Sequence, residues 1–108
     1  MRVIDCMAKA QHKVPKSDIG FALRAARTWR GLAQESFDLV SGRTYISAIE
    51  RGLKDPTVGK INQLAEVLEI HPLTLLSLAY IDPAASPVVS AETLVDQLRL
   101  ELLAIRTG

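Results

Sequence analysis

Cysteine and histidine are scarce in this chain, which limits the chemistry that it can support. Cys6 is the only cysteine among 108 residues, so no disulfide can form within the chain. The two histidines, His12 and His71, stand without cysteine or carboxylate neighbours at the spacing of metal ligands. His71 precedes Pro72 and is better interpreted as the residue that opens a helix. The sequence therefore predicts a reducing compartment and no bound metal.

Long apolar runs are also missing. The longest, Leu73 to Ile81, is interrupted by Thr74 and Ser77 and is well short of the roughly 20 residues that a membrane span requires. Met1 is followed by a polar, basic segment that is unlike a secretory signal. We therefore expect a cytoplasmic protein that makes no use of a membrane.

The motifs of common catalytic sites are absent from the sequence. It has no glycine-rich loop to cradle a phosphate, and no nucleophile with a base and an orienting partner at recognisable spacing. The sequence shows no evident pocket for a small-molecule effector. The prediction is a non-enzymatic protein that needs no cofactor and acts by reversible binding.

What the chain does have is enough apolar content, 48%, to fill one compact helical core. Its net charge of +1 is unevenly distributed, because the first 17 residues are basic. The charged residues of this segment are Arg2, Lys9, Lys13 and Lys16, against Asp5. We interpret residues 1–17 as a flexible basic arm, with contact to an anionic partner as the alternative.

Start and stop signals divide residues 18–81 into five predicted helices. Ser17 or Asp18 caps the first, and Gly31 ends it. Later helices are opened by Thr57 and Pro72. The five segments span about 18–30, 34–40, 43–51, 57–68 and 72–78, followed by a linker over 82–89. The fold class is all-α, with an additional C-terminal helix over 90–108.

The third predicted helix has one face suited to anchoring and another left free. Ile46 and Ile49 lie three residues apart and share a face that can pack on the core. The turn before this helix is Ser41-Gly42. The residues expected to lie nearer the outer face of this helix are Arg43, Thr44, Ser47 and Ala48.

Several motifs occur in the order found in the lambda-repressor/Cro-like family, also called the xenobiotic-response-element type. They are Ile19-Gly20, Arg27, Gly31-Leu32, Gln34-Glu35, Ile46-Ser47, Ile49-Glu50-Arg51-Gly52 and Pro56-Thr57. Residues from about 18 to 81 resemble this family over all five of its helices. The segment 43–51 also looks like the recognition helix of restriction–modification controller proteins. The resemblance implies a helix-turn-helix domain that binds double-stranded DNA.

One departure from the family pattern lies inside the motif. The chain has about two residues fewer than the family between Gln34-Glu35 and Ile46-Ser47. Counting forward makes Gly42 the turn glycine, whereas counting backward puts Val40 at that place. We therefore expect a helix-turn-helix with a trimmed second helix or turn.

The resemblance also implies roles for individual residues. The predicted base contacts are Arg43, Thr44, Ser47 and Ala48, because the first residues of a recognition helix reach base edges. The predicted phosphate contacts are Gln34, Tyr45, Arg51 and Lys54. Ser47 and Ala48 could equally be plain surface residues, and the Tyr45 ring could instead pack on the second helix.

Two further assignments concern structure rather than DNA. In this family the residues matching Arg27 and Glu50 form an ion pair that links the first and third helices, so we expect the same pair here. Trp29, the only tryptophan, is interpreted as a core or helix-packing residue.

The C-terminal segment 90–108 carries an apolar stripe with 3-4-3 spacing. Its members are Val95, Leu98, Leu102 and Ile105. The stripe could fold back on the domain or pair with its copy in a second chain. We favour a homodimer, because two recognition helices then read a palindromic operator.

These observations together predict a sequence-specific DNA-binding transcription regulator, a repressor or an autoregulator. The alternative is a protein-interaction module, antitoxin-like or scaffold-like, that keeps a degenerate helix-turn-helix and uses the C-terminal stripe to hold a partner. Its best support is the shortened motif.

Overall fold

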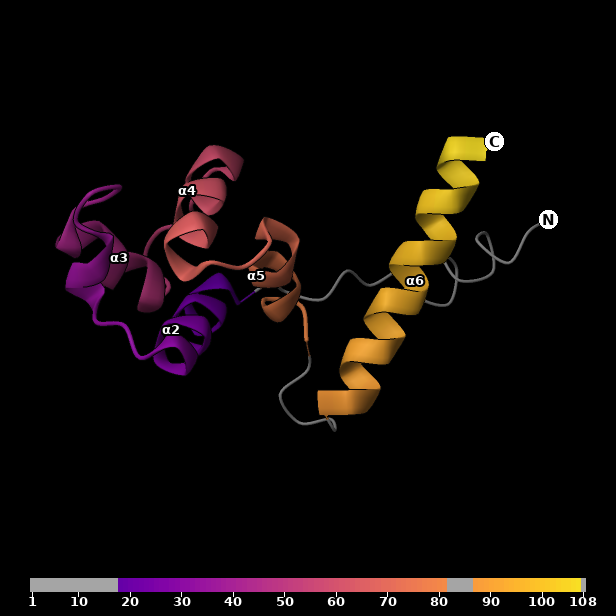
Figure 1. The fold of residues 1–108 in the computed structure, drawn as a ribbon, viewed down its shortest axis with the longest axis horizontal. Coiled ribbons are helices and arrows are strands. Elements are labelled where there is room, and N and C mark those ends of the chain that lie inside the picture. Colours follow the sequence, from indigo (N-terminus) through magenta and orange to yellow (C-terminus); the bar gives the residue numbers. More distant parts are fainter. Residues whose placement is uncertain (1–17, 82–86, 108) are drawn as a thin grey trace. The chain divides into compact units, whose positions relative to one another are not determined.

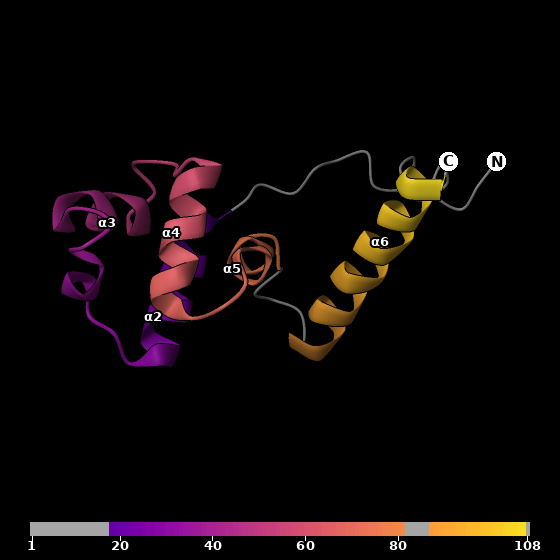
Figure 2. The same cartoon turned by 45° about the horizontal axis from the view of Figure 1, so that its top comes forward.

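The computed structural model of this chain describes residues 18–81 and 87–107, and the regular structure in these ranges is entirely helical (Figures 1 and 2). The predicted all-α class is confirmed for this part of the chain. The predicted basic arm over residues 1–17, and most of the predicted linker, lie outside the described residues. The described residues divide into two units on either side of residue 80, each considered by itself below.

The first helix, α2, spans Ile19–Arg30 and has the ends that its sequence predicts. The Asp18 carboxylate accepts a hydrogen bond from the Phe21 N–H at 3.0 Å, which satisfies one free donor of the first turn. At the other end Gly31 adopts a left-handed conformation with φ of 71°, and its N–H donates to Thr28 O. The buried face of α2 carries Ile19, Gly20, Ala22, Leu23 and Ala26.

The second element is shorter than the predicted helix over 34–40. It is a single turn of 3₁₀-helix, η1, over Gln34–Phe37. The N–H groups of Val40 and Ser41 both donate to Phe37 O and close one more turn of chain, and regular helix resumes only at Arg43. The Phe37 side chain is fully buried and anchors this turn to the core. The full-length helix was therefore wrong, and the trimmed second element expected from the spacing is what forms.

The third element, α3, spans Arg43–Glu50 and lies directly on α2. At the crossing of the two helices the α2 residue is Gly20, where a Cβ atom would lie only 2.5 Å from the Ile49 carbonyl oxygen. The chain reverses after α3 at Gly52, with φ of 79°. Only the missing side chain of Gly20 allows the two backbones to approach this closely.

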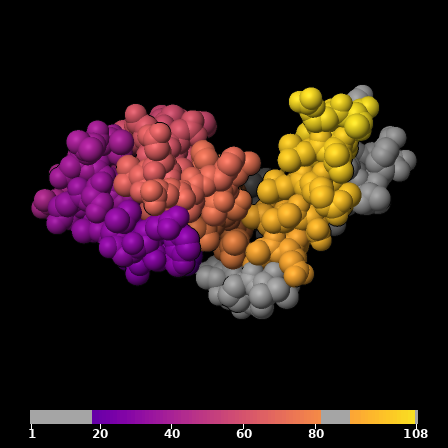
Figure 3. Space-filling model, viewed as in Figure 1, coloured from indigo at the N-terminus to yellow at the C-terminus, as the bar shows by residue number. Residues whose placement is uncertain are grey.

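Two more helices complete the unit of residues 18–80. Helix α4 spans Val58–Leu68 and is capped by the Thr57 hydroxyl, while α5 spans Pro72–Leu78. His71 Nδ1 accepts a hydrogen bond from the Leu73 N–H at 3.0 Å, which confirms that this histidine opens a helix. Helix α2 packs on α3, α4 and α5, and on the face seen in Figure 3 these helices form one continuous surface. The fully buried large side chains are Leu23, Phe37, Ile46, Ile49, Leu64, Leu68 and Leu75.

The remaining helix, α6, spans Pro87–Thr107 and belongs to the other unit. It begins three residues before the predicted start at Ser90, because proline is well tolerated in the first turn of a helix. The predicted apolar stripe is exposed along it, and its members are Val95, Leu98, Leu102 and Ile105.

Candidate nucleic-acid interface

Helix α3 is anchored on one side and open at its N-terminal end. Ile46 and Ile49 have no exposed surface, so they fix the helix to the core. Arg43 and Thr44, in the first turn, are both exposed. The Arg43 side chain is 62% exposed, and its Nε lies 4.0 Å from Glu35 Oε1, at the limit of an ion pair. An exposed first turn on a rigidly held helix is the geometry needed to present side chains to a partner.

The C-terminal end of α3 is held by a buried carboxylate. Arg27 Nε donates to Glu50 Oε2 at 2.7 Å, and Arg27 Nη2 donates to Oε1 at 3.0 Å. Gln34 Nε2 donates to the same Oε1 at 3.1 Å. The Glu50 side chain is 1% exposed. One carboxylate therefore joins α2, η1 and α3.

The charges around Glu50 favour its ionised form. Burial is the largest single influence and alone would raise the pKa of this carboxyl group, while hydrogen bonds from Arg27 and Gln34 lower it. The positive charges of Arg27 and Arg24 act in the same direction, so the pKa of Glu50 lies below its ordinary value. The hydrogen bond to Glu50 correspondingly raises the pKa of Arg27. Both groups are charged at neutral pH.

A scan of known families identifies the central part of the chain. Residues 23–75 match the family described as Helix-turn-helix, from the interior of α2 to the interior of α5. These residues form a helix-turn-helix domain of the lambda-repressor-like type. At the level of this family the protein is a DNA-binding transcriptional regulator. Neither the curated proteins nor the solved structures gave a match.

The four residues predicted to contact phosphates differ in their burial and in the contacts that they already make within the domain. Gln34 is partly buried, and its amide already donates to Glu50. Tyr45 is half-buried against the core, with Lys60 Nζ 5.7 Å from its ring centre. Lys54 is exposed, whereas the exposed Arg51 folds back along α3, with its Nε 3.4 Å from Ser47 O.

Two orientations predicted from the sequence are wrong. Ala48 is 8% exposed and does not point outward, because it lies in the last turn of α3, where the chain reverses and the Leu53 N–H donates to Ala48 O. Trp29 is 68% exposed and is no core residue. The Arg30 guanidinium lies over the Trp29 ring, 4.5 Å from its centre, and both residues are at the surface of the domain.

Two basic residues that sequence reasoning missed tie the domain together. Lys60 Nζ donates to Val40 O at 2.6 Å, joining α4 to the turn before α3. Arg30 donates to the carbonyl oxygens of Leu68 and Glu69 at the end of α4, at 2.6 and 2.9 Å. The available signal was a long basic side chain at the edge of an apolar stripe, because such side chains cover apolar surface with their stems.

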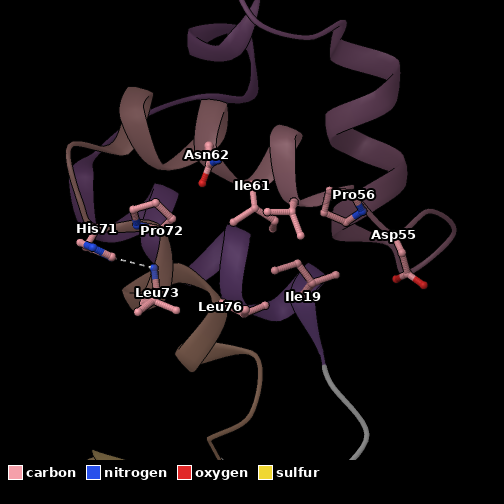
Figure 4. A pocket seen from close by; sticks show the side chains of 10 residues that line it. Ile19, Asp55, Pro56, Ile61, Asn62, His71, Pro72, Leu73 and Leu76 are labelled. Atoms are coloured by element: carbon pink, nitrogen blue, oxygen red, sulfur yellow. Dashed lines mark hydrogen bonds between the residues drawn. The ribbon is translucent and has the colours of Figure 1, made fainter. Parts of the chain in front are cut away.

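An apolar groove lies elsewhere on the domain, where the starts of α2, α4 and α5 meet (Figure 4). Its volume is about 360 Å³. Ile19, Ile61 and Leu76 supply apolar walls, and His71 stands at the edge with its Nδ1 occupied by the helix-opening bond to Leu73. The sequence did not predict this hollow.

Two further properties concern all residues that the structure describes. None of their helices combines the length and apolarity that crossing a membrane requires. Within the same residues, no three histidine, cysteine, aspartate or glutamate side chains gather as a metal-binding group.

Proposed function

We propose that this helix-turn-helix protein is a sequence-specific regulator that binds a palindromic operator as a homodimer and represses transcription, its own included. The observation that carries the proposal is the exposed first turn of α3 on a helix fixed by buried side chains. Such a turn fits the major groove, where residues at the start of a recognition helix meet base edges.

Three side chains are proposed to read bases. Arg43 is the main one, because its guanidinium can donate two hydrogen bonds to guanine O6 and N7. Thr44, next to it, is exposed, and Ser47 lies one turn further along α3 and is half-exposed. The buried Ala48 is left out of this set.

Four side chains are proposed to contact phosphates around this helix. Lys54 and Arg51 are exposed just beyond the C-terminal end of α3 and supply positive charge. Gln34 uses one amide N–H for Glu50 and has a second for a phosphate oxygen. Tyr45 would contribute through its hydroxyl group. These contacts fix the orientation of the domain without reading sequence.

Replacing Arg43 by alanine should weaken binding to the preferred site by roughly 1–3 kcal/mol and leave binding to unrelated DNA nearly unchanged. The preferred site is first selected from a random-sequence pool and from DNA upstream of the gene. Gel shifts across a salt series then compare the variant with Arg51→Ala, which should weaken binding to all sequences and flatten the salt dependence. An unaltered footprint and affinity for Arg43→Ala would remove this arginine from the base-reading set.

Dimerisation is proposed to use the exposed stripe of α6. Val95, Leu102 and Ile105 are 59%, 58% and 77% exposed, which leaves a substantial apolar surface for a second copy of the helix. A dimer doubles the DNA contacts of a small domain on a palindromic site.

The variant Leu98→Asp should convert the dimer to a monomer, because a carboxylate in a paired apolar seam loses its hydration. Sedimentation velocity measures the change, and specific DNA affinity should fall by more than about tenfold with it. Thr93→Asp, at an exposed place on the same helix, serves as the matched control. If both variants sediment as the unaltered protein does, α6 is no dimerisation element.

A protein-interaction module is the second candidate, favoured by the same exposed stripe and by the shortened η1 turn. If the protein is such a module, Leu98→Asp abolishes its biological activity, whereas Arg43→Ala barely changes that activity. The pair of variants thus separates the two functions.

A further inference from the structure

Lys60 reaches from α4 into the turn of residues 38–42, which leads from η1 to the recognition helix α3. Its Nζ donates to Val40 O at 2.6 Å and lies 5.7 Å from the centre of the Tyr45 ring. Val40 belongs to the turn, and Tyr45 belongs to α3. A single ammonium group therefore connects three parts of the domain.

Apart from the Lys60 bond, the turn is held by the packing of the Val40 side chain against the core and by its backbone bonds to η1. Regular helix stops at Phe37 and resumes at Arg43. Gly42, the cap of α3, has no side chain that could bond the free N–H groups of the first turn. The N–H groups of Val40 and Ser41 hold the turn to η1, but neither bond ties it to α4. The Lys60 contact supplies that tie.

The surroundings of Lys60 separate it from the exposed basic residues. Lys60 is partly buried, whereas Arg43, Arg51 and Lys54 are exposed. A hydrogen bond from an ammonium group to a carbonyl oxygen is stronger than one between neutral groups, and the nearby ring adds a cation–π attraction. The ammonium group is thus engaged within the protein and is not left for a phosphate.

We infer that Lys60 is a positioning residue that holds the shortened turn against α4 and so aims Arg43 and Thr44 at the base edges. The inference rests on the proposed function, since it assigns to Lys60 the precision of the same DNA-reading surface. Residues that support a binding surface from behind control its affinity without touching the ligand.

The test replaces Lys60 by methionine, which keeps most of the stem and removes the charge and the donor. The Thr57 cap is retained, because it bonds the Lys60 backbone N–H. Specific DNA affinity should fall roughly tenfold, while the slope of log affinity against log salt stays unchanged. The matched control, Lys54→Met, should flatten that slope by about one and weaken binding to all sequences alike.

Hydrogen exchange measured without DNA tests whether Lys60 holds the turn, separately from whether the protein reads DNA. The amides of Ser41 and Ile46, which donate to Phe37 O and Gly42 O, should exchange faster in Lys60→Met, with α2 amides unchanged. Unchanged exchange at Ser41 and Ile46 would overturn the inference, as would a salt slope reduced by one. If Lys60→Met does not fold, Lys60→Gln, which keeps a shorter donor, is measured in the same way. If the unaltered protein prefers no DNA sequence, the proposed function is rejected. The exchange result would still show whether Lys60 holds the turn against α4.

Discussion

A methyl group added at Gly20 is expected to destabilise the domain by about 3 kcal/mol and to lower its melting temperature by roughly 12–24 °C. The new Cβ would lie 2.5 Å from Ile49 O and 2.9 Å from Glu50 O. Both atoms belong to the backbone of α3, so no change of side-chain rotamer can relieve the overlap. The two helices must separate, which disturbs the buried contacts of Ile49 and Glu50 together.

The chain contains a matched control for this change. Gly59→Ala makes the same substitution in α4, where the nearest atom to the new Cβ is Thr57 Oγ1 at 3.9 Å. With no overlap to relieve, alanine should stabilise α4 by roughly 0.5–1 kcal/mol. Urea and thermal denaturation followed by circular dichroism measure both variants. If Gly20→Ala were as stable as the unaltered protein, α2 and α3 could not cross as closely as the structure places them.

The parts of the fold that sequence analysis predicted well depend on local chemistry. The ends of α2 follow from Asp18 as a cap and from the left-handed Gly31, and the start of α4 follows from the Thr57 hydroxyl. In each case a residue and a partner within a few places along the chain decide the outcome. The apolar spacing of Ile46 and Ile49 likewise predicted which face of α3 is buried.

The parts that were missed depend on contacts between distant residues. The bond from Lys60 to Val40 joins residues 20 apart, and no local signal specifies it. The spacing predicted a shortened second element but not that it would be a 3₁₀ turn, because that depends on how Phe37 meets the core. Ala48 was misplaced because helical periodicity takes no account of where the chain returns after a helix of two turns.

Removing the Arg27 side chain should have the largest effect of the changes considered, about 3–5 kcal/mol at neutral pH. In Arg27→Met the Glu50 carboxylate, 1% exposed, keeps Gln34 but loses its bidentate partner. The carbonyl of Leu32 also loses the bond from Arg27 Nη1, at 3.0 Å. Such a loss is a large fraction of the stability of a domain this small. Denaturation by urea at several pH values measures it.

Arg24→Met is the control for this change, because Arg24 Nε also lies near Glu50, at 3.6 Å, but its side chain is 59% exposed. Solvent screens that pair, so its removal should cost less than about 1 kcal/mol. Equal losses in the two variants would contradict the special role of the buried pair.

The pH dependence gives a second and independent check on the Arg27–Glu50 pair. In the unaltered protein the pKa of Glu50 is lowered on folding, so its contribution is present above the ordinary glutamate pKa of about 4.3 and is lost as pH falls through the lower, folded value. In Arg27→Met burial dominates and raises the pKa of Glu50, so protonation relieves the buried charge. The stability difference between the two proteins should therefore shrink as pH falls from 7 toward 3. A difference independent of pH would mean that packing of the Arg27 stem, and not the charge on Glu50, accounts for the loss.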